Sequence, residues 1–293
     1  MADIREISDR MKSIRDTKKI TNAMYMISSN KLQKAKKRLE NTEPYYYNLQ
    51  YAMKRILRHL DEDVSDYMRK PVSTPEHRKR AVIVIGGDKG LAGAYNHNIT
   101  KEAQNFLLTS DSNTVFVFGD LGRQFFKSHQ IPYEADFTSN VTNPSLHRAR
   151  IISGKVLSLF ESEAVEEVWI IYTKMENSLS SKLITEKLLP VERPAEKVDI
   201  NIHREDLRME PTPKDVMNYV IPNYVTGYIY CALAEANCSE ENARMMAMET
   251  AGNNAADLLW DLNVEFNRAR QAQITQQITE IIGGAKALNK DSQ

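Results

Sequence analysis

The chain has 293 residues, of which 42% are hydrophobic, and its 39 lysines and arginines balance its 39 aspartates and glutamates. This neutrality argues against a protein that coats nucleic acid and against an acidic disordered chain. Only 11 glycines and 10 prolines interrupt the sequence, fewer than is usual at this length, so we expect a few long elements, mainly helices.

Residues 1–60 are predicted to form one long helix. The segment has no glycine, and its only proline is Pro44. Its apolar residues recur at steps of three and four, beginning with Ile4, Ile7, Met11 and Ile14. Because basic and polar side chains surround this narrow stripe, the helix cannot build a core alone and needs a partner helix.

The middle of the chain has a different pattern. Residues 61–79 are charged and include Pro71 and Pro75, which predicts a linker. Over residues 80–211, short apolar runs alternate with helical stretches, which predicts an α/β domain with a parallel sheet and right-handed crossovers. The expected strands are Ala81–Ile85, Thr114–Phe118, Glu167–Thr173 and, as a further candidate, Ser181–Val191; the expected helices lie near 97–109, 120–129 and 144–161.

Residues 212–293 are predicted to form a second long helical segment. Pro213 suits a helix start, whereas Pro222 is expected to kink or interrupt the first turns. After Ser239 the chain continues to Ile282 with Gly252 as its only breaker. A helix of that kind, extended to residue 288, would be roughly 75 Å long and must project from any compact body.

The two ends of the chain carry opposite charge. Residues 1–40 hold eleven lysines and arginines against five acidic residues, whereas residues 240–293 hold five against eight. Each end also has an apolar stripe that needs a partner, so their pairing satisfies both. The predicted fold class is therefore an α/β domain flanked by N- and C-terminal helices that form a long antiparallel coiled coil.

A glycine-containing turn at Gly87–Gly93 follows the first predicted strand and precedes a predicted helix. Phosphate-binding loops occupy this position in α/β proteins. The glycines are spaced three and three, however, and no Lys-Ser or Lys-Thr pair follows Gly93. A tight strand-to-helix turn and a nucleotide site both remain open, and the spacing favours the turn.

The remaining polar residues indicate no catalytic site. None of the six histidines is at metal-ligand spacing from Cys, Asp or Glu, and no G-x-S-x-G or H-E-x-x-H motif occurs, so we expect no catalytic residues, metal or cofactor. Cys231 and Cys238 lie too far apart on a helix for a disulfide. The basic stretch from Lys31 to Arg38 is interpreted as a solvated face, as a docking surface for an acidic protein segment or, less favoured, as a nucleic-acid contact.

Three blocks of the sequence closely resemble one family. The run NRARQAQITQQITEIIGGAKAL at Asn267–Leu288 and the run beginning IREISDRMKSIRDTKKITNAM at Ile4–Lys36 resemble the two ends of the F-type ATP synthase gamma subunit. The run GDKGLAGAYN at Gly87–Asn96 resembles its central turn. The resemblance covers the whole chain, and the terminal blocks are long and ungapped.

This resemblance implies a fold and a mechanism. The family combines an antiparallel coiled coil with a Rossmann-like α/β domain that binds no nucleotide. It implies a non-catalytic rotor in the central stalk, with the coiled coil inside the ring of alpha and beta subunits and the lower part seated on the membrane c-ring with the epsilon subunit. It further implies that the chain transmits torque between the c-ring and the catalytic ring, which couples ion translocation to ATP synthesis or hydrolysis.

Site residues follow from the resemblance position by position. Contacts with the catalytic beta subunit are implied at Met24, Lys31, Lys34, Arg270, Gln271 and Thr275. Arg270 and Gln271 match residues that touch a catch loop, and Thr275 matches a nearby polar contact. Met24 matches a methionine that faces an acidic lever loop of beta, for which Lys31 and Lys34 are ionic partners. Two positions depart from the family pattern, Asn22 and Gln277.

The resemblance also implies roles for one arginine and one turn. Arg244 matches an arginine that helps to couple rotation to catalysis. The turn formed by Gly87, Asp88, Lys89 and Gly90 is expected on the side of the c-ring and the epsilon subunit. A bacterial protein is preferred, peripheral to the cytoplasmic face of the plasma membrane, because we find no membrane-spanning run and no transit-peptide pattern.

Two competing functions are weighed against the rotor. A nucleotide-dependent enzyme would need phosphate binding at the turn Gly87–Gly93. A coiled-coil scaffold would self-associate, whereas a rotor would be one copy in a larger hetero-oligomer. Without the resemblance, the residues support only a long coiled coil around an α/β domain, with a partner and without a nucleic-acid ligand.

Overall fold

The computed structural model describes residues 4–60, 64–135, 140–178, 180–192 and 208–290. Parts of the predicted linker, at 61–63, and of the predicted α/β segment, at 193–207, therefore lie outside the described residues. The chain divides into two compact units, one comprising residues 1–27 and 245–293 and the other residues 28–244. The site residues are distributed over both units, and each unit is described by itself.

Two long helices begin and end the described chain. Helix α1 spans Ile4–His59 and includes Pro44, and helix α5 spans Pro213–Lys290. The expected start of α5 at Pro213 is confirmed, but the helix is not interrupted at Pro222. Met217, Ile221 and Val225, which flank this proline, are fully buried, and their packing offsets the roughly 3 kcal/mol that an interior proline costs.

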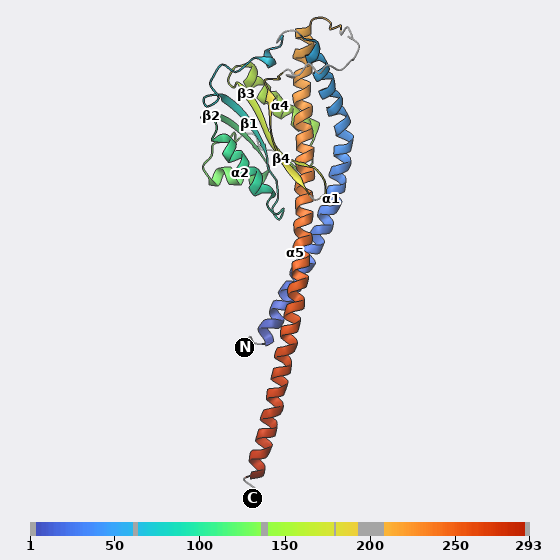
Figure 1. Cartoon of the computed structure of the whole chain (residues 1–293), viewed down its shortest axis with the longest axis vertical. Helices are drawn as coiled ribbons and strands as arrows, with labels where there is room; N and C mark the ends of the chain where they lie inside the picture. Colours follow the sequence, from blue (N-terminus) through green and yellow to red (C-terminus); the bar gives the residue numbers. More distant parts are fainter. Residues whose placement is uncertain (1–3, 61–63, 136–139, 179, 193–207, 291–293) are drawn as a thin grey trace. The chain divides into compact units, whose positions relative to one another are not determined.

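The unit of residues 28–244 contains a four-stranded sheet in the order β2-β1-β3-β4 (Figure 1). The strands are β1 at Lys79–Ile85, β2 at Ser112–Phe118, β3 at Glu167–Met175 and β4 at Ser181–Leu189. Strand β1 pairs in parallel with β2 and β3, as predicted, whereas β4 is antiparallel to β3. The connection from Met175 to Ser181 is a short hairpin, too short for the crossover that a parallel fourth strand would require.

Shorter helices join the strands. They are α2 at Tyr95–Leu107, α3 at Asp120–Ser128 and α4 at Leu146–Glu161, all within two residues of the predicted bounds, with a short 3₁₀ helix η1 at Asp66–Met68. Val82 and Val84 of β1 pack with Ile99 of α2 and Phe126 of α3 on one face of the sheet. The alternate residue Ile83 is also fully buried, so both faces of β1 are covered.

Helix α5 packs on β3 and β4 within this unit. The rings of Tyr172 and Tyr228 meet edge to face with centroids 6.3 Å apart, and the Tyr228 hydroxyl donates a hydrogen bond to the Glu186 carboxylate. Ser239 lies inside α5, and its buried hydroxyl donates to the carbonyl oxygen of Thr173, 3.0 Å away.

The other unit is built from the first turns of α1 and the later turns of α5. An added Cβ at Gly252 would lie 3.2 Å from Asn22 Oδ1 and 3.5 Å from Thr21 Oγ1, so the two helices approach closely there. Ile7, Thr21, Met248 and Ala255 are buried in this unit. The side chains of residues 270–283 are all exposed.

Candidate functional site

The turn after β1 is held in shape by its own chain. The backbone N–H of Gly87 donates to Asn96 Oδ1 at 2.9 Å, and Asn96 Nδ2 donates to the Lys89 carbonyl oxygen at 3.4 Å. Because Asn96 lies in the first turn of α2, these bonds fix the start of that helix relative to the turn. The side chain of Asp88 is buried, whereas Lys89 and Gly90 are exposed.

A carboxylate of α5 contacts this turn from outside the sheet. Glu240 is only 2% exposed, and its two oxygens accept the backbone N–H groups of Lys89 at 3.2 Å and Asp88 at 3.4 Å. Burial, together with the charge of Asp88, raises the pKa of Glu240 above its ordinary value, although the hydrogen bonds from Arg244 and Lys89 oppose this shift. The hydrogen-bond partners around this carboxylate are N–H donors, which match its ionised form.

Arg244 lies one helical turn after Glu240 and completes the contact. Its Nη2 donates to Glu240 and, at 3.0 Å, to the carbonyl oxygen of Lys89, while its Nε donates to the carbonyl oxygen of Gly90 at 3.1 Å. Burial alone would lower the pKa of this arginine, but hydrogen bonding and charge from Glu240 and Glu241 raise it. The structure thus brings together two predicted site elements, Arg244 and the turn Gly87–Gly90.

Asp88 connects the turn to the segment before α4. Its carboxylate accepts the backbone N–H groups of Val141 at 3.1 Å and Thr142 at 2.6 Å, and also the Thr142 hydroxyl at 2.5 Å. Arg148 of α4 donates to the carbonyl oxygens of Asn140 and Thr142 at 2.9 and 3.1 Å. Asp88 is therefore a structural hydrogen-bond acceptor, and its carboxylate points into the protein.

Lys31 also belongs to this network. Its Nζ lies 3.5 Å from Glu241 Oε1, and Glu241 Oε2 lies 3.0 Å from Arg244 Nη1. This chain of charges joins α1 to α5 and to the turn. The Lys31 side chain keeps 40% of its surface exposed, so it remains open to a partner.

Lys34 lines a cationic groove formed by α1, α4 and α5. The groove has a volume of about 730 Å³, and its positive side chains are Lys34, Lys37, Arg38 and Arg150. Among the residues that the structure describes, none of those lining it is acidic. The lining residues of α1 run from Lys34 to Tyr45, about 16 Å along the helix axis, so the groove is elongated.

The other predicted contact residues lie in the unit of residues 1–27 and 245–293. Met24 is half-buried, whereas Arg270, Gln271 and Thr275 are exposed. The Thr275 hydroxyl donates to the backbone carbonyl oxygen of Gln271 at 2.9 Å. Large apolar side chains are exposed on the same part of α5, namely Ile274, Ile278, Ile281 and Ile282.

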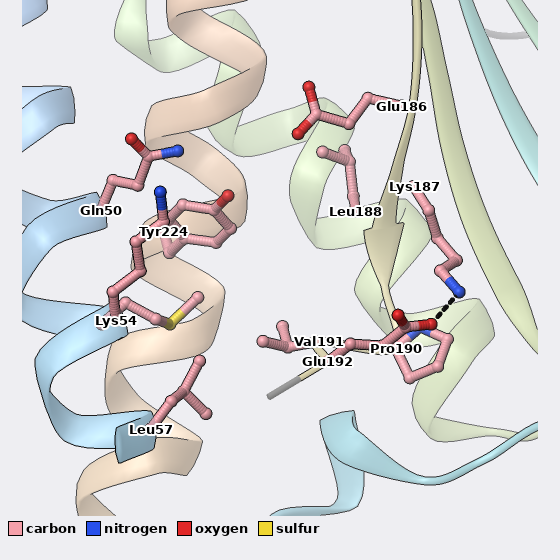
Figure 2. A pocket seen from close by; sticks show the side chains of 11 residues that line it. Gln50, Lys54, Leu57, Glu186, Lys187, Leu188, Pro190, Val191, Glu192 and Tyr224 are labelled. Carbon is pink, nitrogen blue, oxygen red and sulfur yellow. Dashed lines mark hydrogen bonds and ion pairs between the residues drawn. The ribbon is translucent and has the colours of Figure 1, made fainter. Parts of the chain in front are cut away.

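A cavity of about 540 Å³ lies between α1, β4 and α5 (Figure 2). Figure 2 shows Gln50 and Lys54 on α1, Tyr224 on α5 and Glu186 on β4 around it, with Lys187 paired to Glu192 at its rim. None of the predicted site residues lines it. Its polar groups form no nucleophile–base pair, so this cavity gives no reason to assign a catalytic reaction.

In the described part of the chain, no group of three His, Cys, Asp or Glu side chains could hold a metal ion. No described helix combines the length and the apolar character needed to cross a bilayer. Cys231 and Cys238 are buried free thiols, and burial raises the pKa of each to about 12.

Sequence reasoning missed Glu240 and Glu241 as members of the site. A signal was available, because Arg244 follows them at spacings of four and three residues, at which side chains on a helix meet. The contact of Glu240 with Asp88 and Lys89 has no such signal, since about 150 residues separate them in the sequence.

Comparison with known proteins gives concordant matches. A family model described as ATP synthase matches residues 3–288. The ATP synthase gamma chain of Acetivibrio thermocellus is 42% identical over 295 residues, which cover 98% of this chain and 100% of the relative. The ATP synthase gamma chain of Staphylococcus carnosus is 35% identical, over a match that covers 98% of this chain and 100% of the relative.

Solved structures share the fold at lower identity. The rotor of Euglena gracilis mitochondrial ATP synthase contains a chain with a TM-score of 0.64 at 17% identity, with coverage of 92% of this chain and 98% of that one. A chain from the central stalk and c-ring of the Tetrahymena thermophila mitochondrial ATP synthase has a TM-score of 0.60 at 22% identity. The match covers 79% of this chain and 99% of that one.

Proposed function

Because the chain belongs to the ATP synthase gamma-chain family, we propose that it is the central-stalk rotor of an F-type ATP synthase. In this role it transmits torque between a membrane c-ring and a catalytic ring of alpha and beta subunits, and so couples ion translocation to ATP synthesis or hydrolysis. The observation that carries the proposal is full-length similarity to curated gamma chains at 35–42% identity. The chain from the rotor of Euglena gracilis mitochondrial ATP synthase supports it through its fold.

We propose that the chain itself is non-catalytic. A torque shaft needs stiffness and an asymmetric surface, which two interlocked helices supply. In the proposed layout, residues 1–60 and 212–293 are the coiled-coil segments, 61–79 a linker and 80–211 a Rossmann-like α/β domain. The close approach of α1 and α5 at Gly252 supports an antiparallel coiled coil.

The exposed turns of α5 are proposed to contact the beta subunit. Arg270 and Gln271 present polar groups to solvent, as a catch-loop contact requires, and Thr275 lies one turn further along the helix. Four isoleucines are exposed on residues 274–282, which a soluble chain alone would not favour. A surrounding ring of alpha and beta subunits would cover these isoleucines. Met24 is proposed to face the acidic lever loop.

The cationic groove supports ionic contacts for Lys34. Three cationic side chains on α1 together with Arg150 on α4 complement an acidic protein segment better than a single small anion. Lys31, with part of its surface exposed, is proposed to share this contact with beta.

We propose that Arg244 contributes to coupling through its own chain. Its side chain is 2% exposed and is hydrogen-bonded to the turn, so it acts by holding Lys89 and Gly90 in place. These two residues are exposed and are proposed to face the c-ring and the epsilon subunit. The complex would place the chain at the cytoplasmic face of a bacterial plasma membrane as a peripheral subunit.

Co-expression with alpha and beta subunits tests the rotor proposal. We expect one copy of the chain to co-elute with an active alpha–beta assembly in size exclusion, and the ATPase activity to collapse when the chain is omitted. Elution as its own dimer, beside an alpha–beta assembly that turns over normally, would instead support the scaffold. Binding of ATP by the isolated chain would revive the nucleotide-dependent enzyme.

A further inference from the structure

The sheet has a switch point between β1 and β3. From β1 the chain passes through α2 to β2 on one side, whereas from β3 it passes to β4 on the other side. Strands β1 and β3 are parallel neighbours, so their carboxyl ends lie at the same edge of the sheet. In open α/β sheets, ligands bind at this edge, where neighbouring strands connect in opposite directions.

One stretch of α5 occupies this edge. Ser239 donates to the Thr173 carbonyl near the end of β3, and Asn242 Nδ2 donates at 3.2 Å to the Ser178 carbonyl just after that strand. Between them, Glu240 reaches the turn after β1. All three side chains are nearly or fully buried, so α5 itself fills the position where a ligand would enter.

The surroundings of Glu240 are those of a bound anion. Two consecutive backbone N–H groups, of Asp88 and Lys89, converge on its oxygens, and the Arg244 guanidinium contacts one of them. An added Cβ at Gly87 would lie 3.1 Å from the Glu240 carboxyl carbon, so glycine permits this close approach. Consecutive backbone N–H groups of a turn form anion-binding sites in proteins, and arginine is a common donor to phosphate and carboxylate groups.

We propose that Glu240 is an internal anionic ligand of the turn Gly87–Gly90. Its carboxylate fills the place where related sheets bind a phosphate or carboxylate, excludes free anions from that place and joins α5 to the sheet. Glu240 is thus a positioning residue, and the inference does not depend on the rotor function. It also explains in physical terms why a strand-turn-helix unit of this kind needs no nucleotide.

Chemical rescue of the full-length chain tests the proposal. Glu240→Ala should lower the thermal midpoint, and sodium formate or acetate should raise it again in a saturable manner. Sodium chloride at the same ionic strength should not, because a chloride ion lacks the paired oxygens that match two N–H donors.

The matched control is Glu235→Ala. Glu235 is equally buried on α5 but faces Lys174, 3.8 Å away, on β3. Formate should raise the thermal midpoint of Glu235→Ala no more than chloride does. Equal rescue of both variants, or no saturable rescue of Glu240→Ala, would overturn the proposal.

A second variant covers the case in which Glu240→Ala does not fold. Glu240→Gln keeps the shape and removes the charge, so the amide proton resonances of Asp88 and Lys89 should move upfield together. In the unsubstituted chain, ATP or inorganic phosphate should shift neither resonance. Unmoved amides in Glu240→Gln, or amides that shift on titration with phosphate, would contradict the assignment.

Discussion

Arg244→Met is expected to destabilise the chain by about 3–5 kcal/mol, the range for removing one partner of a buried charge pair. The Arg244 side chain is 2% exposed and neutralises the carboxylates of Glu240 and Glu241, whose side chains are 3% and 6% exposed. Methionine fills similar volume, so the loss reports charge and hydrogen bonds rather than a cavity. Chemical denaturation of the full-length chain, followed by circular dichroism, measures the effect.

A control variant and a double variant test the same prediction. Lys19→Met removes an exposed lysine whose ion pair with Asp16 is solvated, and it should leave the free energy of unfolding nearly unchanged. The double variant Glu240→Gln/Arg244→Met should recover part of the loss, because one uncompensated charge is gone. Equal stability of Arg244→Met and the unsubstituted chain would show that the charge network is not structural.

Gly119→Ala is expected to cost about 3 kcal/mol or more, through backbone strain and steric overlap together. Gly119 lies between β2 and α3 with φ of +91°, a conformation that residues with a side chain rarely adopt. An added Cβ would lie 2.8 Å from backbone atoms of Gly86 and Gly87. Since these atoms lead into the turn Gly87–Gly90, the substitution should also loosen the Glu240 contact.

Gly154→Ala is the matched control for this substitution. Gly154 lies in the interior of α4 with open space around its Cβ position among the described residues. Alanine there should stabilise the chain by about 0.5–1 kcal/mol, because it favours the helix. Denaturation midpoints of the two variants should therefore move in opposite directions, and a shared direction would show that the local geometry at Gly119 is not decisive.

The central α/β elements could be predicted from the sequence because their signals are local. Ala81–Ile85 is a continuous apolar run followed by glycines, which is typical of a strand buried on both faces. The antiparallel direction of β4 depends on the length of one connection. The expected interruption at Pro222 does not occur for a tertiary reason, since buried neighbours stabilise a helix that local propensity alone would interrupt.

The candidate site was predictable only in part. The resemblance pointed to Arg244 and to the turn Gly87–Gly90, but gave no indication that they touch each other. Their contact joins residues about 150 positions apart, and Glu240, which lies between them in space, is unremarkable as an acidic residue on a helix. Burial of a charged side chain cannot be read from its sequence neighbours, and this burial gives Glu240 its proposed role.

The most direct test of the rotor is to watch the chain turn. Lys101 is exposed on α2, so Lys101→Cys can carry a rod through a reactive thiol, while buried Cys231 and Cys238 remain unlabelled. With alpha and beta subunits fixed to a surface, ATP should drive stepwise rotation of the rod in one direction. ATP hydrolysis by the same assemblies with a stationary or randomly diffusing rod would contradict the account.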